Sequence, residues 1–139
     1  MPREVFVDTG AWVALADADD SLHRVAVDYY RGILAEAMPL VTTNLVIAEA
    51  YIILRRAGGH APATLFLRSV RQTTRLRKVF SDYELETIAE NILGRYTDQD
   101  FSFTDAVSFA AMRQSKIEEA FAFDHHFQTA GFIIQPARH

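Results

Sequence analysis

The sequence predicts a three-layer α/β domain in which a parallel, roughly five-stranded central sheet carries helices on both faces. Short, continuously apolar runs alternate with longer helical patterns, as in parallel sheets that helices cover on both sides. No repeat, low-complexity tract or Pro/Gly/Ser-rich linker divides the chain. Its 139 residues suit one compact domain, so we assign residues 1–139 to a single domain.

The first third of the chain supplies two strands and a helix between them. Val5–Val7 is an apolar run that predicts a buried strand ending at Asp8. We expect a helix within residues 21–37, because Pro39 marks a helix end. A second short strand is predicted over residues 40–42.

Two helices are predicted next, and capping signals define their ends. Thr43 or Asn44 can cap a helix that runs to about Ala57. Gly58-Gly59 closes that helix, with a left-handed C-terminal cap expected there. Pro62 suits the first turn of the following helix.

The remaining elements follow the same alternation. Short apolar runs predict three further strands over residues 78–80, 120–123 and 132–134. Ser81 and Glu84 have the spacing of a capping box for a helix to about Leu93. Thr104 is a good N-cap for another helix. Five strands therefore alternate with helices along the chain.

Composition excludes several classes of protein. The chain is half apolar and 23% charged, which excludes a disordered tail or a collagen-like fibre. It has no cysteine, so disulfide scaffolds, thiolate zinc sites and cysteine nucleophiles are excluded. The apolar run Val5–Val7 is too short for a signal peptide, and no later stretch approaches a membrane span. We therefore expect a cytoplasmic protein.

Three acidic residues stand where an α/β sheet binds its ligands. Asp8 and Asp124 each follow a predicted buried strand, and ligands of open α/β sheets bind outside the carboxyl ends of strands. Asp105 lies in the first turn after the predicted Thr104 cap. Each acid also has a structural interpretation, as a turn residue or as a partner of a helix dipole.

Glu49 is an unusual acid because the helix around it is apolar almost all round. A helix of that kind is expected to be buried, and an ionised glutamate inside it is costly unless it is paired or bound to a metal. Its helical neighbours at three and four residues are Ile52 and Ile53, so an ion pair within the helix is not expected.

If the four acids converge, their repulsion requires compensation. Two like charges 4 Å apart repel by about 4 kcal/mol at an effective dielectric of 20. Carboxylates without Cys or His partners form an all-oxygen site, which suits Mg²⁺ or Mn²⁺. Such an ion can activate water for displacement at phosphorus. The pattern therefore favours metal-assisted phosphodiester hydrolysis.

Four short motifs in this order resemble those of the PIN domain, and more closely those of the VapC-type toxins of bacterial and archaeal toxin–antitoxin pairs. The resemblance covers residues 4–134. Its motifs are Phe6-Val7-Asp8-Thr9, Thr43-Asn44 with Glu49 and Leu54 downstream, Phe103-Thr104-Asp105-Ala106, and Phe123-Asp124 with Phe127.

The resemblance implies an Mg²⁺- or Mn²⁺-dependent endoribonuclease. In position, Asp8, Glu49, Asp105 and Asp124 match the acidic quartet that binds metal and catalyses cleavage. Thr9, Asn44 and Thr104 match polar positions that support these acids. The resemblance also implies a five-stranded parallel sheet, a homodimer, and a cognate antitoxin whose tail covers the active-site groove.

One segment of the chain is basic and is a candidate RNA-binding surface. Residues 51–80 carry a charge of +7, whereas the other 109 residues carry −11 and the whole chain −4. Phosphate contacts set the affinity of such surfaces for nucleic acid, although a solvated helix face explains the charges equally well. The residues we expect to contact RNA are Arg55, Arg56, Arg68, Arg71 and Arg75.

Other polar and aromatic residues are interpreted as structural. Asp98 and Asp100 could approach a metal but fit a polar loop better. The adjacent His125 and His126 are expected to have a structural or surface role. Asp17, Asp19, Asp20, Glu118 and Glu119 are expected to be solvated, and Trp12, Phe101, Phe103 and Phe109 to lie in the core.

Two other functions stay open at this point. A PIN-like scaffold could hold RNA or a protein without cutting it, although such a scaffold has no need for four mutually repelling acids. A phosphatase resembling the haloacid dehalogenase group would use Asp8 as its nucleophile. That group places a second Asp two residues on, where this chain has Gly10, and neither Lys78 nor Lys116 has a convincing context for its lysine.

Overall fold

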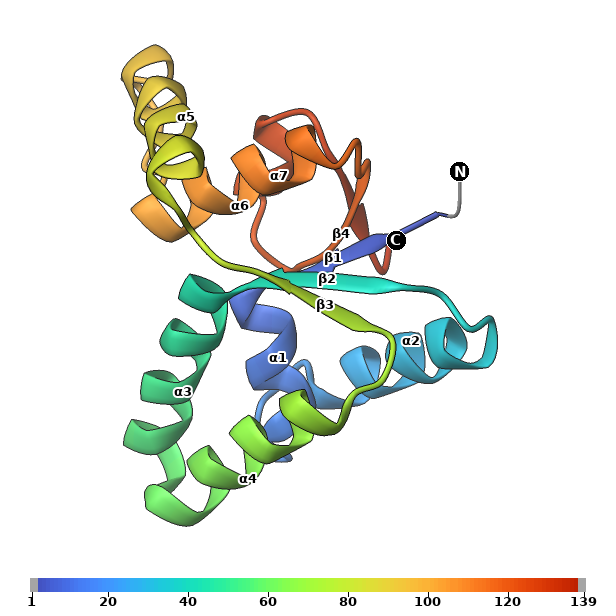
Figure 1. Ribbon diagram of the computed structural model, residues 1–139. Helices are drawn as coiled ribbons and strands as arrows, with labels where there is room; N and C mark the ends of the chain where they lie inside the picture. Colours follow the sequence, from blue (N-terminus) through green and yellow to red (C-terminus); the bar gives the residue numbers. More distant parts are fainter. Residues whose placement is uncertain (1–2, 138–139) are drawn as a thin grey trace.

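Residues 3–137 are described by a computed structural model, in which five parallel strands form one sheet with helices on both faces (Figure 1). The strands are β1 (Val5–Val7), β2 (Leu40–Thr43), β3 (Leu76–Val79), β4 (Glu119–Phe121) and β5 (Ile133–Gln135). The helices are α1 (Thr9–Ala16), α2 (His23–Ala35), α3 (Asn44–Gly58), α4 (His60–Gln72), α5 (Tyr83–Arg95), α6 (Phe103–Gln114) and α7 (His126–Thr129). The predicted fold class is confirmed.

The order of the strands creates a topological switch point at the centre of the sheet. The order is β3-β2-β1-β4-β5, and every neighbouring pair is parallel. The chain thus builds outward from β1 through β2 to β3, then crosses to β4 on the other side of β1 and ends at β5. Ligands of open α/β sheets bind where the strand order reverses in this way, which here is the carboxyl end of the β1–β4 pair.

The two faces of the sheet are covered by different helices. Figure 1 shows α1 to α4 on one face and α5 to α7 on the other. Aromatic side chains fill the space under the second group: the ring of Phe109 lies 5.0 Å from that of Phe127, which lies 6.1 Å from Phe6. These three side chains are fully buried, so the strand that precedes Asp8 and the segment that follows Asp124 share one rigid core.

Most predicted elements are present with shifted ends. The strands predicted at 78–80 and 120–123 lie at Leu76–Val79 and Glu119–Phe121, and the last strand starts one residue late. Glu119 is not solvated as expected, because its carboxylate pairs with Arg3 and also accepts a hydrogen bond from Gln135. Two helices, α1 and α7, were not predicted. The buried, largely apolar sequence of α1 offers no periodic signal, and α7 has only four residues.

The caps explain where the helices begin. The Thr43 hydroxyl accepts a hydrogen bond from the Val46 amide at 3.1 Å, as predicted. The N-cap of α5 is Asp82 rather than Ser81, and that of α6 is Ser102 rather than Thr104. Gly59 ends α3 with a positive φ of 89°, but its ψ of −167° is extended rather than left-handed helical.

Candidate active site

The candidate site lies at the carboxyl edge of the sheet, at the switch point between β1 and β4. Asp8 directly follows β1, and its amide donates to the Phe121 carbonyl at the end of β4 at 3.0 Å. Asp124 lies three residues beyond that strand. Behind Asp8, the Thr42 hydroxyl donates to the Val7 carbonyl at 2.9 Å and accepts from the indole of Trp12 at 3.2 Å. The end of β1 is therefore held from both neighbouring strands.

Helices α3 and α6 bring the other two acids to the same edge. Glu49 lies on the second turn of α3, which starts directly after β2, and Asp105 lies in the first turn of α6. All four acids line one pocket of about 300 Å³. The other residues of this pocket are Thr9, Gly10, Val13, Asp20, Leu22, Ile53 and Phe123.

Glu49 reaches the pocket from a helix that is less buried than expected. One side of α3 faces solvent, with Ala48, Ile52 and Ile53 exposed, and Glu49 is half-buried. The apolar sequence of α3 was misinterpreted as a sign of complete burial. Asp20, expected to be solvated, is a half-buried fifth acid of the pocket, and its carboxylate accepts from the Leu22 amide at 2.8 Å.

Asp8 is the most perturbed acid of the site. Its side chain is only 5% exposed, and burial is the main cause that raises its pKa from 3.8 to about 8. The Thr9 amide opposes this rise, whereas the negative charges of Asp105, Asp124 and Glu49 add to it. All three other acids thus act on Asp8, and the metal-free protein holds a proton there at neutral pH.

This proton makes the stability of the metal-free protein depend on pH. Because the pKa of Asp8 is higher in the folded state, its contribution to stability is lost as the pH rises from about 4 to about 8. Asp8→Asn should therefore remove the part of the decline in unfolding free energy that the ionisation of Asp8 causes. Urea unfolding in EDTA at pH 5, 7 and 8.5 measures it, with the exposed Asp98→Asn as the matched control. Equal pH slopes for wild type and Asp8→Asn would contradict this account.

Asp105 is held in place by the start of its own helix. The Ser102 hydroxyl accepts from the Asp105 amide at 3.0 Å, while Asp105 Oδ2 accepts from the Ser102 amide at 3.0 Å. This reciprocal capping box satisfies two helix-end donors. Within residues 3–137, it leaves Asp105 Oδ1 free of protein hydrogen bonds, and that oxygen is available to a ligand.

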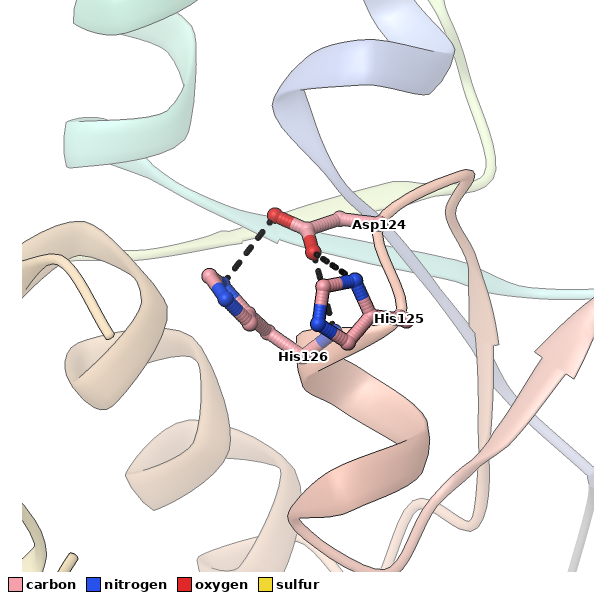
Figure 2. A group of neighbouring side chains, drawn as sticks. All are labelled: Asp124, His125 and His126. Atoms are coloured by element: carbon pink, nitrogen blue, oxygen red, sulfur yellow. Dashed lines mark hydrogen bonds and ion pairs between the residues drawn. The ribbon is translucent and has the colours of Figure 1, made fainter. Parts of the chain in front are cut away.

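His126 is a residue of this site that the sequence interpretation missed. Figure 2 shows its ring beside one oxygen of the Asp124 carboxylate and the ring of His125 beside the other. His126 Nδ1 lies 3.1 Å from Asp105 Oδ2 and 3.3 Å from Asp124 Oδ2. Its side chain is 16% exposed, whereas that of His125 is 77% exposed. No local pattern signalled this position, because the direction of the ring depends on its contacts with Phe101, Asp105 and Asp124.

The three polar residues predicted to support the acids have different positions. Thr9 lines the pocket, and its buried hydroxyl has no hydrogen-bond partner among the described residues. Asn44 Oδ1 instead accepts from the Ser81 amide at 2.8 Å and so ties the start of α3 to the loop after β3. Thr104 is half-buried in the first turn of α6 and does not line the pocket.

The residues present fit a hard divalent cation. The pocket offers carboxylate oxygens from four segments and a buried threonine hydroxyl without a partner, and buried polar groups normally have one. Oxygen donors of this kind suit Mg²⁺ or Mn²⁺. Asp124, His125 and His126 also bring one potential ligand atom each within 4.8 Å of one another, but imidazole nitrogen is not the ligand that a hard cation prefers.

Comparison with known proteins identifies the fold family. The sequence model of the PIN domain family matches residues 5–133, a range that includes all four acids. The chain belongs to the PIN domain family. It is also 38% identical over 130 residues to the 23S rRNA-specific endonuclease VapC20 of Mycobacterium tuberculosis, covering 93% of this chain and 95% of VapC20. The resemblance to VapC-type PIN domains is thus confirmed, and the alternative of a phosphatase of the haloacid dehalogenase type is excluded.

Solved structures agree with the PIN domain assignment. The crystal structure of M. tuberculosis VapC20, a toxin described as cleaving the sarcin–ricin loop, matches with a TM-score of 0.82 and 36% identity, over 93% of this chain and 96% of that one. FitAcB from Neisseria gonorrhoeae matches with a TM-score of 0.68 over 94% and 95% of the two chains. At 12% identity, this second match concerns the PIN fold alone.

Most of the predicted RNA-binding arginines lie away from the pocket of this PIN domain. Arg75 precedes β3 at the opposite edge of the sheet and donates to the Ala37 carbonyl at 3.0 Å. Arg71 lies in the last turn of α4, which leads to that same edge, and Arg68 is exposed on α4. Arg55 contacts the Tyr51 hydroxyl and His60 Nδ1, both at 3.0 Å.

Arg56 is the best placed of the five arginines. It follows Glu49 by seven residues and Ile53 by three, so the helical period puts it on the pocket face of α3. It is exposed, and within the described chain it has no ion pair. Of the five arginines, Arg56 is thus the one on the Glu49 side of α3, about two helical turns beyond that acid and outside the pocket lining.

The other acidic and aromatic residues singled out in the sequence lie partly in the core and partly at the surface. Asp98 and Asp100 are exposed in the loop before α6 and do not line the pocket. Trp12 and Phe109 are buried as expected, and Phe101 is half-buried. Phe103 was wrongly expected in the core, since it is 40% exposed at the start of α6.

Across residues 3–137, no helix is both long and apolar enough to cross a membrane.

Proposed function

We propose that this protein hydrolyses RNA phosphodiester bonds with Mg²⁺ or Mn²⁺ bound by Asp8, Glu49, Asp105 and Asp124. The observation that carries the proposal is the pocket at the switch point, which four acids from distant segments line. Burial raises the pKa of Asp8 there to about 8, and the negative charges of Asp105, Asp124 and Glu49 add to the rise. A scaffold that only binds RNA gains nothing from this repulsion, because its charge disfavours a phosphate.

Each side chain has a definite task in this proposal. A divalent cation held by these acids would neutralise charge at the scissile phosphate and lower the pKa of an attacking water. Asp8 loses its proton and, with Asp105 and Asp124, supplies carboxylate oxygens at the base of the pocket. Glu49 supplies a carboxylate from the α3 side, and the unpaired Thr9 hydroxyl can orient a water beside Asp8.

The similarity to VapC20 suggests a class of RNA to test first. VapC20 is named for specificity toward 23S rRNA, and we propose large-subunit rRNA as the substrate of this chain. Arg56 would contact the RNA backbone next to the pocket, since such contacts position a strand without reading its sequence. An RNA substrate of this kind also supports a cytoplasmic location.

Cleavage mapping tests this function. Wild type is incubated with total RNA and Mg²⁺ or Mn²⁺, and new 5′ ends are mapped by sequencing. We expect cleavage at few sites, concentrated in large-subunit rRNA, and no cleavage with Asp8→Asn. Equal cleavage by Asp8→Asn would assign the activity to a contaminant, and intact RNA under every condition would favour a non-catalytic binding module.

We further propose a cognate antitoxin as the partner that silences this activity. An apolar groove of about 210 Å³ lies between α1, α2 and α4, on the other side of α1 from the acidic pocket. Its lining includes Trp12, Leu15, Tyr30 and Phe66, with the exposed Leu65 at its rim. An amphipathic segment bound there could extend over α1 to the acids.

We also propose that the protein is a homodimer, as its membership in the VapC-type PIN domains suggests. Three exposed apolar residues are candidates for a contact between two copies: Ile52 on α3, Phe80 directly after β3, and Tyr83 at the start of α5. Apolar side chains of this size are rarely left in contact with water in groups.

A further inference from the structure

We propose that His126 is a positioning residue that holds Asp105 and Asp124 at a fixed separation for cation binding. The inference rests on the function proposed above, because it concerns how the same pocket is kept in shape. It assigns a role to a side chain that matches none of the acidic or hydroxyl positions predicted from the sequence. His126 contacts both acids at once, through the same ring nitrogen.

The contacts of His126 with Asp124 involve both carboxylate oxygens. The His126 amide donates to Asp124 Oδ1 at 2.9 Å, and His126 Nδ1 lies 3.3 Å from Asp124 Oδ2. Asp124 follows β4 in a short loop and is 39% exposed. A half-exposed carboxylate in a loop samples several rotamers unless hydrogen bonds select one. Two contacts from one residue fix both its orientation and its position.

The contact with Asp105 completes the link between the two acids. His126 Nδ1 hydrogen-bonds Asp105 Oδ2 at 3.1 Å, and that oxygen also accepts from the Ser102 amide at 3.0 Å. The capping box therefore sets Asp105 relative to α6, while His126 sets Asp124 relative to Asp105. The same Nδ1 lies 3.3 Å from Asp124 Oδ2, within ion-pair distance, so one ring atom faces both carboxylates.

The ring of His126 is itself held by aromatic packing. It meets Phe101 edge-on at 5.2 Å, and Phe101 packs against Phe109 at 5.1 Å and Tyr96 at 5.2 Å. Phe127, the next residue, is fully buried against Phe6. The backbone and the ring are thus both anchored in the core, which is what a support for metal-binding carboxylates requires.

His125 provides the contrast that makes the inference specific. Its ring lies 3.7 Å from Asp124 Oδ1, beyond hydrogen-bond distance, and is 77% exposed. Figure 2 shows the two rings next to different oxygens of the Asp124 carboxylate, His125 near Oδ1 and His126 near Oδ2. A general effect of a nearby imidazole should be equal for the two residues, whereas a positioning effect belongs to His126 alone.

The experiment compares Mn²⁺ affinity in matched variants, with free Mn²⁺ measured from its electron paramagnetic resonance signal. His126→Ala should weaken binding by about 10- to 100-fold, the usual effect of losing a support for a metal ligand. His125→Ala should bind within twofold of wild type. His126→Asn places an amide nitrogen where Nδ1 lies and should restore much of the affinity, whereas His126→Gln reaches past that position and should not.

Cleavage kinetics give a second readout. Because the role proposed for His126 is to hold Asp105 and Asp124, His126→Ala should lower kcat and leave KM for RNA within about twofold. Melting temperatures of the four variants without metal show whether each one is folded. If His126→Ala does not fold, the comparison of His126→Asn with His126→Gln still tests the inference.

The outcomes separate this inference from the proposed function. Three outcomes would overturn the role of His126 and leave the proposed function standing. His126→Ala could bind Mn²⁺ as tightly as wild type, or His125→Ala could lose as much Mn²⁺ affinity as His126→Ala. The third outcome is an equal Mn²⁺ affinity of His126→Asn and His126→Gln. A wild-type protein that binds no Mn²⁺, or an Asp105→Asn variant that cleaves RNA normally, would overturn the function itself.

Discussion

Asp105→Asn should abolish RNA cleavage while leaving the metal-free protein at least as stable as wild type. Asparagine keeps an acceptor for the Ser102 amide, so the capping box at the start of α6 can persist. It removes a negative charge that raises the pKa of Asp8, and repulsion in the metal-free pocket falls accordingly. Loss of a metal ligand should lower kcat by more than the 10- to 100-fold typical of supporting residues.

The measurement pairs single-turnover cleavage with urea unfolding in EDTA. Asp100→Asn is the matched control, because Asp100 is an exposed acid of the loop that leads into the same helix and does not line the pocket. It should leave both quantities unchanged. If Asp105→Asn loses activity and stability together, then Asp105 is needed for folding and its assignment to metal binding is wrong.

The topology explains why two of the acids could be placed from the sequence. Asp8 and Asp124 follow continuously apolar strands, and the carboxyl ends of parallel strands share one edge of a sheet. Only the strand order, however, makes them neighbours, since β1 and β4 pair across 114 residues of chain between Val5 and Glu119. That order depends on long-range packing, which no local pattern contains.

Burial was harder to predict than position. The apolar sequence of α3 indicated a buried helix, yet one side of it faces solvent and Glu49 is half-buried. Helix α1 gave the opposite error: a largely buried, apolar sequence has no 3.6-residue period, so it did not indicate a helix. His126 was missed because the direction of a side chain at the start of so short a helix follows from tertiary contacts, here with Phe101 and the two acids.

Mg²⁺ or Mn²⁺ should stabilise the wild-type protein, and more strongly at high pH. A ligand at 100 times its dissociation constant adds about 2.7 kcal/mol to the free energy of unfolding. For a domain of this size, each kcal/mol raises the melting temperature by about 2–4 °C, so a rise of roughly 5–11 °C is expected. Asp8→Asn should lose most of this rise, whereas the exposed Asp98→Asn should retain it.

The pH dependence of this stabilisation follows from Asp8. A cation that binds its carboxylate must displace the proton held there with a pKa of about 8. At a fixed Mg²⁺ concentration, the rise in melting temperature should therefore be larger at pH 8.5 than at pH 6.5. Since the metal-free protein loses the stabilising contribution of protonated Asp8 over the same range, the two effects together make high pH the most sensitive condition. A rise that is the same at both pH values would show that the cation binds elsewhere.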